Sequence, residues 1–121
     1  MDLVELSRIE SSINKFGENF LTRILTKEEL EYLTPQRQLT FVAGRFAAKE
    51  AFGKALGTGL KGISLKDIRV TTARSGKPEL SLGGTAEKAL RNSGGRRVHL
   101  SLTHDGALAI AQVIIEGEDH V

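Results

Sequence analysis

The feature that most constrains this chain is a long segment, from about Pro35 to Gly57, whose apolar residues recur at the spacing of one helical face. Gly57 is a residue that typically follows a helix C-terminus, so we expect a helix of about twenty residues, the longest element of the fold. The residues expected on its apolar stripe are Leu39, Val42, Ala43, Phe46 and Ala47.

One carboxylate interrupts this pattern. Glu50 lies four residues after Phe46 and three after Ala47, so a helix directs it along the apolar row. A buried carboxylate is costly unless it meets a cation or a metal. The helix therefore raises the question of what Glu50 binds.

The segment before this helix is expected to be helical. "SRIESSINKFG" contains a potential capping box, Ser7 with Glu10, and "ENFLTRIL" continues at helical spacing. Thr26 with Glu29 forms a second potential capping box, which opens "KEELEYL".

From Ile63 onward the apolar period changes to two. "IRVTTA", the turn "RSGKP" and "ELSL" predict a β-hairpin, and "GTAEKALRNSGG" predicts a short helix. "RRVHLSLTHD" alternates, Asp105-Gly106 indicates a second hairpin, and "ALAIAQVII" is apolar on both faces, as in a central strand. We predict one α+β domain spanning residues 1–121, with N-terminal helices packed on a mostly antiparallel sheet and a frayed tail, "GEDHV".

The composition narrows the functional classes. The 121 residues are 40% hydrophobic and 26% charged, as in one soluble globular domain. A net charge of +2, with five Phe, one Tyr and no Trp, offers little for nucleic-acid binding. The absence of cysteine excludes a disulfide, a thiolate metal site and a thiol nucleophile. No long apolar run or visible leader occurs, so we expect neither a membrane span nor export, and a cytoplasmic location.

Several charged residues and glycines could be either structural or part of a binding site. Arg45 and Lys49 are spaced i,i+4, as are Glu50 and Lys54, so cations flank the Glu50 carboxylate; these charges could form a solvated stripe of intrahelical ion pairs, or the cations could belong to a binding site. Gly57-Thr58-Gly59 is either a helix cap or a backbone that a ligand can approach closely, and it matches neither of the common phosphate-binding loop spacings. His104 leads out of a strand into a turn, where functional side chains are often presented. Asp2 and Glu50 together could provide oxygen ligands for Mg²⁺.

Taken in order, "DLVELSRI", "RILTKEEL", "FVAGRFAAKEAFGKALGTG", "SGKPEL", "SLTHD" and "AIAQVIIE" resemble the holo-acyl-carrier-protein synthase family, the group I phosphopantetheinyl transferases. The resemblance runs from Asp2 to Glu116. It implies transfer of 4′-phosphopantetheine from coenzyme A to a serine of apo-acyl carrier protein, in fatty acid biosynthesis, by a homotrimer whose sites lie between subunits.

The resemblance also implies roles for individual residues. Asp2 and Glu50 would hold Mg²⁺, and Lys54 would act with them in catalysis. Glu50 or a metal-held water would take the serine proton, and both remain open. The residues matching the family's coenzyme A contacts are Arg45, Lys49, Lys54, Gly57, Thr58, Gly59 and His104.

The acidic carrier would dock on Arg8, Lys15 and Arg23, although Glu10 and Glu18 make this stretch less basic than is usual in the family. Relatives usually have a short Gly-x-Gly strand before the aspartate, whereas only Met1 precedes Asp2 here. Without that strand, Asp2 would lie on a frayed terminus. A non-catalytic coenzyme A binding module is therefore the second hypothesis, and a small basic nucleic-acid binder a distant third.

Overall fold

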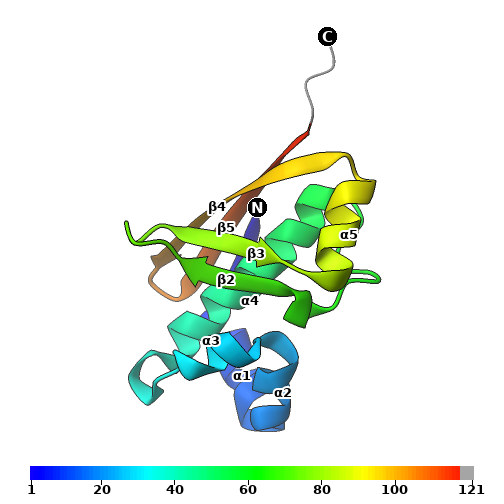
Figure 1. Ribbon diagram of the computed structural model, residues 1–121. Coiled ribbons are helices and arrows are strands. Elements are labelled where there is room, and N and C mark those ends of the chain that lie inside the picture. The colour runs from blue at the N-terminus through cyan, green and yellow to red at the C-terminus, as the bar shows by residue number, and fades with distance from the viewer. Residues whose placement is uncertain (118–121) are drawn as a thin grey trace.

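A computed structural model describes residues 1–117, apart from the side chain of Arg37, and Figure 1 shows the arrangement of its elements. The helices are α1 (Leu6–Phe16), α2 (Glu18–Ile24), α3 (Lys27–Glu31), η1 (Pro35–Arg37), α4 (Gln38–Leu56), η2 (Leu65–Asp67) and α5 (Gly84–Asn92). The strands are β1 (Asp2–Glu5), β2 (Ile68–Thr72), β3 (Pro78–Leu82), β4 (Gly95–Asp105) and β5 (Leu108–Gly117). The expected α+β class is confirmed. Of the expected tail, only Gly117 falls within the described residues, at the end of β5.

The strands form two antiparallel sheets. One has the order β1-β5-β4, and the other is the β2-β3 hairpin. The prediction that "ALAIAQVII" is a central strand is confirmed, because β5 pairs on both sides: Ala111 faces Asp2 of β1 and Leu102 of β4. The N-terminus is therefore tied to the last strand of the described chain.

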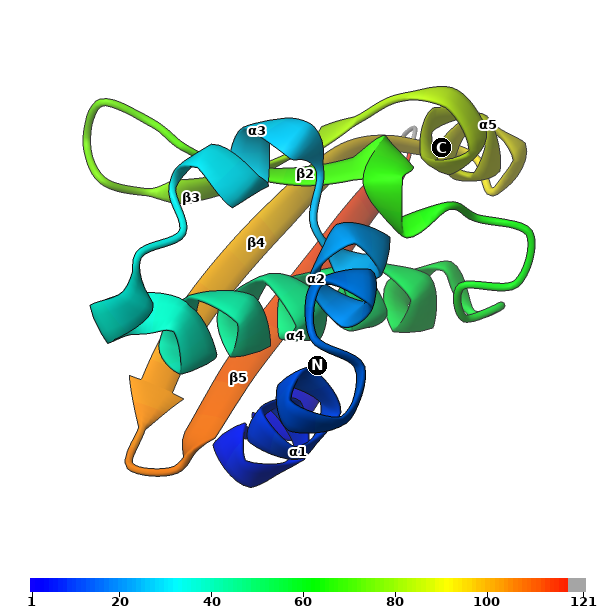
Figure 2. The ribbon, with the colours of Figure 1, turned by 90° about the horizontal axis from the view of Figure 1, so that it is seen from below.

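Helix α4 crosses the three-stranded sheet and lies between that sheet and the short helices α2 and α3 (Figure 2). It is buried on most of its circumference, because elements pack against it from both sides. Ala47 and Ala51 on the helix and Ala109 and Ala111 on β5 are all fully buried, and these small side chains allow a close approach of helix and sheet. Phe52 is also fully buried, and burial of a side chain of this size contributes about 1.5–3 kcal/mol to the free energy of unfolding.

The two predicted capping boxes have different outcomes. The box at Thr26 is confirmed: the N–H of Glu29 donates to Thr26 Oγ1 at 3.1 Å, and the N–H of Thr26 donates to Glu29 Oε1 at 2.8 Å. The box at Ser7 is wrong, since α1 begins at Leu6 and its N-cap, Glu5, makes no side-chain capping bond. The reason is long-range: β1 continues directly into α1, and the N–H of Leu6 donates to Ala107 O at 2.8 Å.

No helix in residues 1–117 has the length and apolar character that a membrane crossing requires.

Candidate functional site

Two of the predicted site residues, Asp2 and Lys54, come together between β1 and α4. Asp2 begins β1, and the ammonium of Lys54, in the last turn of α4, donates to Asp2 Oδ1 at 2.6 Å. The Asp2 side chain is 11% exposed and that of Lys54 is 56% exposed, so the pair lies at a surface open to a ligand. Asp2 is not on a frayed terminus, because β1 pairs with β5 from Asp2 onward.

Glu50 lies one turn before Lys54 on α4 and is half-buried. Burial and the charge of Asp2 raise the pKa of the Glu50 carboxyl, while the cations of Lys54 and Arg8 oppose this rise. The pKa of Lys54 is raised by its hydrogen bond to Asp2 and by the charge of that carboxylate. Two carboxylates thus repel each other beside one lysine, which is an arrangement that a small divalent cation would stabilise.

A second group of side chains lies further back along α4. The guanidinium of Arg45 stacks over the ring of Phe41, 3.9 Å from its centroid. Both line a cavity of ≈ 550 Å³, together with Tyr32 of the loop after α3 and Arg69 of β2. Phe41, Tyr32 and Arg69 were not expected at a site, because residues from three separate segments form this cavity.

His104 lies against the same part of α4. A Cβ built on Gly44 would come within 3.2 Å of the His104 imidazole, so the glycine allows β4 to bring His104 close to the helix backbone. Arg45 follows Gly44 directly. His104 and Arg45 therefore lie at neighbouring positions along α4, and their role in binding coenzyme A stays a prediction.

The predicted turn after α4 folds back on the helix. Gly57 and Gly59 have φ angles of 85° and 68°, which favour glycine, and the N–H of Gly59 donates to Gly53 O at 2.9 Å. Thr58 is exposed between them. The cap interpretation is confirmed, and the turn lies just beyond Lys54 with no side chain shielding its glycines.

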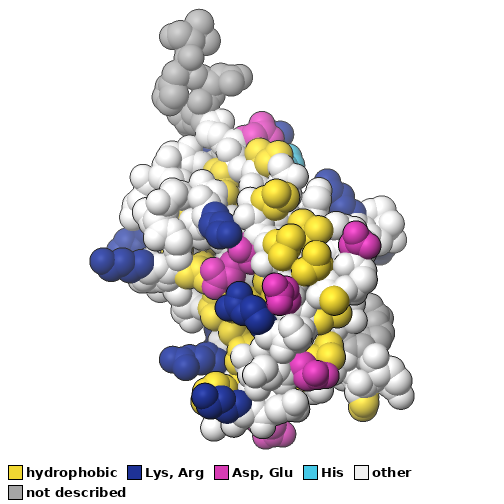
Figure 3. Space-filling model, turned by 180° about the vertical axis from the view of Figure 1, so that it is seen from behind, with side chains coloured by type: hydrophobic (Ala, Val, Ile, Leu, Met, Phe, Trp, Pro, Cys, Tyr) yellow, Lys and Arg dark blue, Asp and Glu magenta, His cyan; other side chains and the backbone are white. Residues whose placement is uncertain are grey.

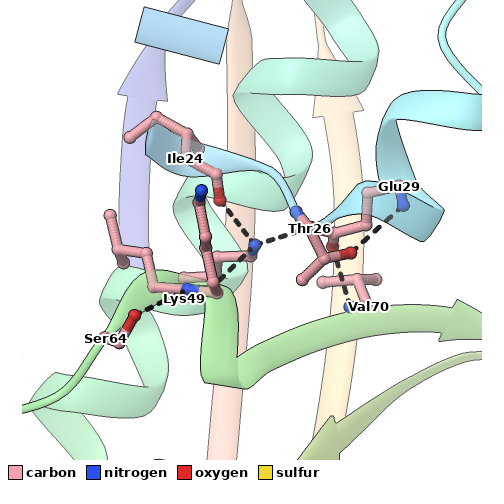
Figure 4. A network of polar contacts seen from close by, with 8 residues as sticks. Ile24, Thr26, Glu29, Lys49, Ser64 and Val70 are labelled. Atoms are coloured by element: carbon pink, nitrogen blue, oxygen red, sulfur yellow. Dashed lines mark hydrogen bonds and ion pairs between the residues drawn. The ribbon is translucent and has the colours of Figure 1, made fainter. Parts of the chain in front are cut away.

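Lys49 requires a correction. We expected it beside a phosphate, but its side chain is fully buried and its ammonium donates to Glu29 Oε1 and to Ile24 O, each at 2.6 Å (Figure 4). The face of α4 that carries Lys49 packs under α2 and α3, so the ammonium points into the protein. Lys49 is an interior cation and not a direct phosphate ligand.

The predicted carrier-binding residues Arg8, Lys15 and Arg23 are exposed on α1 and α2. Arg8 is also near enough to Glu50 to affect its pKa, which connects this surface to the site. Seen from behind, the molecule shows acidic side chains among Lys and Arg, next to a band of hydrophobic side chains (Figure 3).

Comparisons with known proteins agree with these observations. Residues 1–111 match a protein family described as the 4′-phosphopantetheinyl transferase superfamily. A Treponema denticola protein named holo-[acyl-carrier-protein] synthase is 54% identical over 97% of this chain and 95% of its own length. The crystal structure of the synthase of that name from Neisseria meningitidis has a TM-score of 0.88 at 42% identity, covering 95% of this chain and 94% of that one. A Bacillus anthracis synthase structure in complex with CoA (3′,5′-ADP) has a TM-score of 0.77 at 41% identity, covering 97% and 93%.

Proposed function

This chain belongs to the 4′-phosphopantetheinyl transferase superfamily, and from that premise we propose that it is a holo-acyl-carrier-protein synthase serving fatty acid biosynthesis. It transfers 4′-phosphopantetheine from coenzyme A to a serine of apo-acyl carrier protein and releases adenosine 3′,5′-bisphosphate. The observation that carries the proposal is the meeting of Asp2 with Lys54 and Glu50, in a chain that is 54% identical to a protein of that name.

The residues at the site fit a magnesium ion. Asp2 and Glu50 offer hard carboxylate oxygens, and Mg²⁺ in proteins takes one or two carboxylates and fills its other positions with water and phosphate oxygens. Their mutual repulsion, and the ammonium that already neutralises Asp2, indicate a place where positive charge is favourable. Mg²⁺ bound there would neutralise charge on the pyrophosphate of coenzyme A.

The chain's own residues would position the substrate and neutralise developing charge. The carrier serine oxygen bonds to the phosphorus next to pantetheine, and the bond from that phosphorus to the bridging oxygen breaks, so both electrons leave with adenosine bisphosphate. Lys54 offsets the charge that grows on the phosphoryl oxygens, and the exposed glycines beside it let phosphate approach the backbone. Arg45 and His104 are suited to the phosphates or adenosine of the leaving group.

The serine proton needs an acceptor within hydrogen-bond reach. Glu50, whose pKa is raised, retains a proton more readily than an ordinary glutamate. A water beside the metal is the other candidate, and the two remain alternatives. The non-catalytic binding hypothesis has lost its motivation, since Asp2 lies in a paired strand.

We propose further that the acidic carrier docks on Arg8, Lys15 and Arg23. Docking by charge predicts an association rate that falls with added salt, and a rate insensitive to salt would contradict it.

We also propose a trimer. On the outer face of the sheet, opposite α4, lie Leu3, Ile110 and the 53%-exposed Ile114, which a second copy would cover. Light scattering should then give three times the 13.1 kDa chain mass, and a monomer would refute it. The cytoplasmic location stays a prediction.

The transfer itself is tested by mixing the protein with coenzyme A, Mg²⁺ and apo-carrier, and weighing the carrier by mass spectrometry. We expect the added mass of phosphopantetheine, and no addition when a chelator removes Mg²⁺. An unmodified carrier, with coenzyme A still bound to the protein, would refute the transferase proposal and favour a binding module.

A further inference from the structure

One charged cluster lies inside the protein and takes no direct part in the proposed chemistry. The Lys49 ammonium donates to Ile24 O and Glu29 Oε1, each at 2.6 Å, and to Leu65 O at 3.2 Å (Figure 4). A lysine ammonium has three N–H donors, so these bonds use all of them. The cation is therefore fully engaged within the protein.

Glu29 completes the cluster from the other side. It is 2% exposed, and its Oε1 also accepts from the N–H of Thr26, while its Oε2 accepts from the N–H of Val70 at 2.9 Å. The pair of Lys49 and Glu29 thus joins α4 to four other places: the end of α2, the start of α3, η2 and β2. These segments form the layer that covers α4 on the side away from the three-stranded sheet (Figure 2).

Stability alone is a weak reason for such a pair. Two charges taken out of water lose hydration, and replacing a buried ion pair by neutral side chains of similar volume is often neutral or stabilising. What the pair provides instead is a set of directional hydrogen bonds that fix the orientation of α4. Three acceptors from three segments surround one ammonium, so a rotation or a slide of α4 at Lys49 would break several bonds together.

The residues that depend on this setting are neighbours of Lys49 on α4. Glu50 is the next residue and projects about 100° further around the helix, toward Asp2, while Arg45 lies one turn earlier over Phe41. We propose that Lys49 and Glu29 are positioning residues, which hold α4 in the rotation that brings Glu50 and Lys54 to Asp2. The inference rests on the proposed function for its activity readout.

The test uses a double variant, Lys49→Met with Glu29→Gln. It removes both charges, so neither is left unpaired in the interior, and Gln keeps an oxygen that can accept from Thr26 N–H. Two quantities are measured on the full chain: kcat for carrier modification, and the Mg²⁺ concentration that half-saturates the rise in melting temperature in the presence of coenzyme A. A misplacement of about 1 Å can cost on the order of 100-fold in rate, so we expect kcat to fall about tenfold or more, and the half-saturating Mg²⁺ concentration to rise about tenfold.

Leu100→Ala is the matched control. Leu100 is buried in β4 and makes none of the cluster's bonds, so this variant is less stable but should keep wild-type kcat per folded molecule and wild-type Mg²⁺ half-saturation. If Leu100→Ala shifts both quantities as much as the double variant, general loosening explains the effect and the inference fails.

The remaining outcomes also decide. A folded double variant with wild-type kcat and Mg²⁺ half-saturation overturns the inference, because the pair is then structural only. If the double variant does not fold, Glu29→Asp, which keeps both charges but draws the carboxylate away from Lys49, is compared in the same way. If the wild-type protein shows the Mg²⁺-dependent rise in melting temperature but leaves the carrier unmodified, the proposed function fails, while the melting measurement still tests the positioning role.

Discussion

Replacing Glu50 with glutamine tests whether the Glu50 carboxylate binds a metal or serves only to stabilise the fold. In the folded protein burial and Asp2 raise the pKa of Glu50, so its ionised form is less favourable there than in the unfolded chain. Glutamine removes that repulsion. Because Glu50 is only half-buried and Lys54 and Arg8 offset part of the effect, we expect the metal-free variant to gain no more than about 0.5–1 kcal/mol, or on the order of 2–4 °C in melting temperature.

The pH dependence has a definite sign. Since the pKa of Glu50 is raised on folding, its ionisation costs the wild type stability as pH rises through that pKa. The advantage of Glu50→Gln should therefore be absent at low pH, where Glu50 is protonated in both states, and should appear as pH increases. Urea denaturation at several pH values, without Mg²⁺, measures this difference.

Activity should move in the opposite direction. Removal of one group that stabilises transition-state charge in an active site typically costs about 10²–10³ in rate, so if Glu50 holds the metal that does this, mass spectrometry of the carrier should show at least about a 100-fold fall in Mg²⁺-dependent turnover. Glu31→Gln, at an exposed position on α3, is the matched control and should leave turnover and stability near wild type. A Glu50→Gln protein that is less stable than wild type without metal, or that retains Mg²⁺-dependent turnover, would refute the reasoning.

Three other substitutions test separate parts of the structure. Lys54→Met should lower turnover about 100-fold and lower the melting temperature only slightly, since the Lys54 side chain is 56% exposed although Asp2 and Glu50 lose the cation beside them; a large loss of stability would show that its bond to Asp2 is mainly structural. Gly44→Ala places a Cβ 3.2 Å from the His104 ring and should raise KM for coenzyme A severalfold more than it lowers kcat, and an unchanged KM would exclude His104 from coenzyme A binding. Asp67→Asn should be less stable than wild type at neutral pH, because bonds from the Thr85 hydroxyl and N–H lower the pKa of Asp67. That difference should shrink as pH falls through the lowered pKa, and denaturation curves with a constant difference down to low pH would contradict it.

Local patterns in the sequence predict much of the fold, and long-range contacts account for the errors. The span of α4, the β2-β3 hairpin and the cap at Thr26 depend on neighbours within a few residues, so their periodicity and spacing suffice. The start of α1 depends on a bond from Leu6 to Ala107, which no local pattern contains.

At the candidate site, too, local spacing predicts some features and long-range contacts determine the others. Spacing places Glu50 and Lys54 on one side of α4, but the closeness of Asp2 was expected only from the family resemblance. Lys49 was wrongly taken for a surface cation, because its partner Glu29 lies twenty residues away and belongs to another helix. No local pattern distinguishes Lys49 from an exposed lysine, because its burial depends on the packing of α2 and α3 over α4.

The pairing of β1 with β5 affects when activity can arise during folding. Asp2 is held by Ala111, a residue far from it in the sequence. Contacts between such distant segments form late and limit folding rates. Helix α4 can form with Glu50 and Lys54 on it before β1 and β5 meet, but Asp2 then has no strand to hold it beside them. Modification of the carrier should therefore begin only after this pairing has formed, later than the helices.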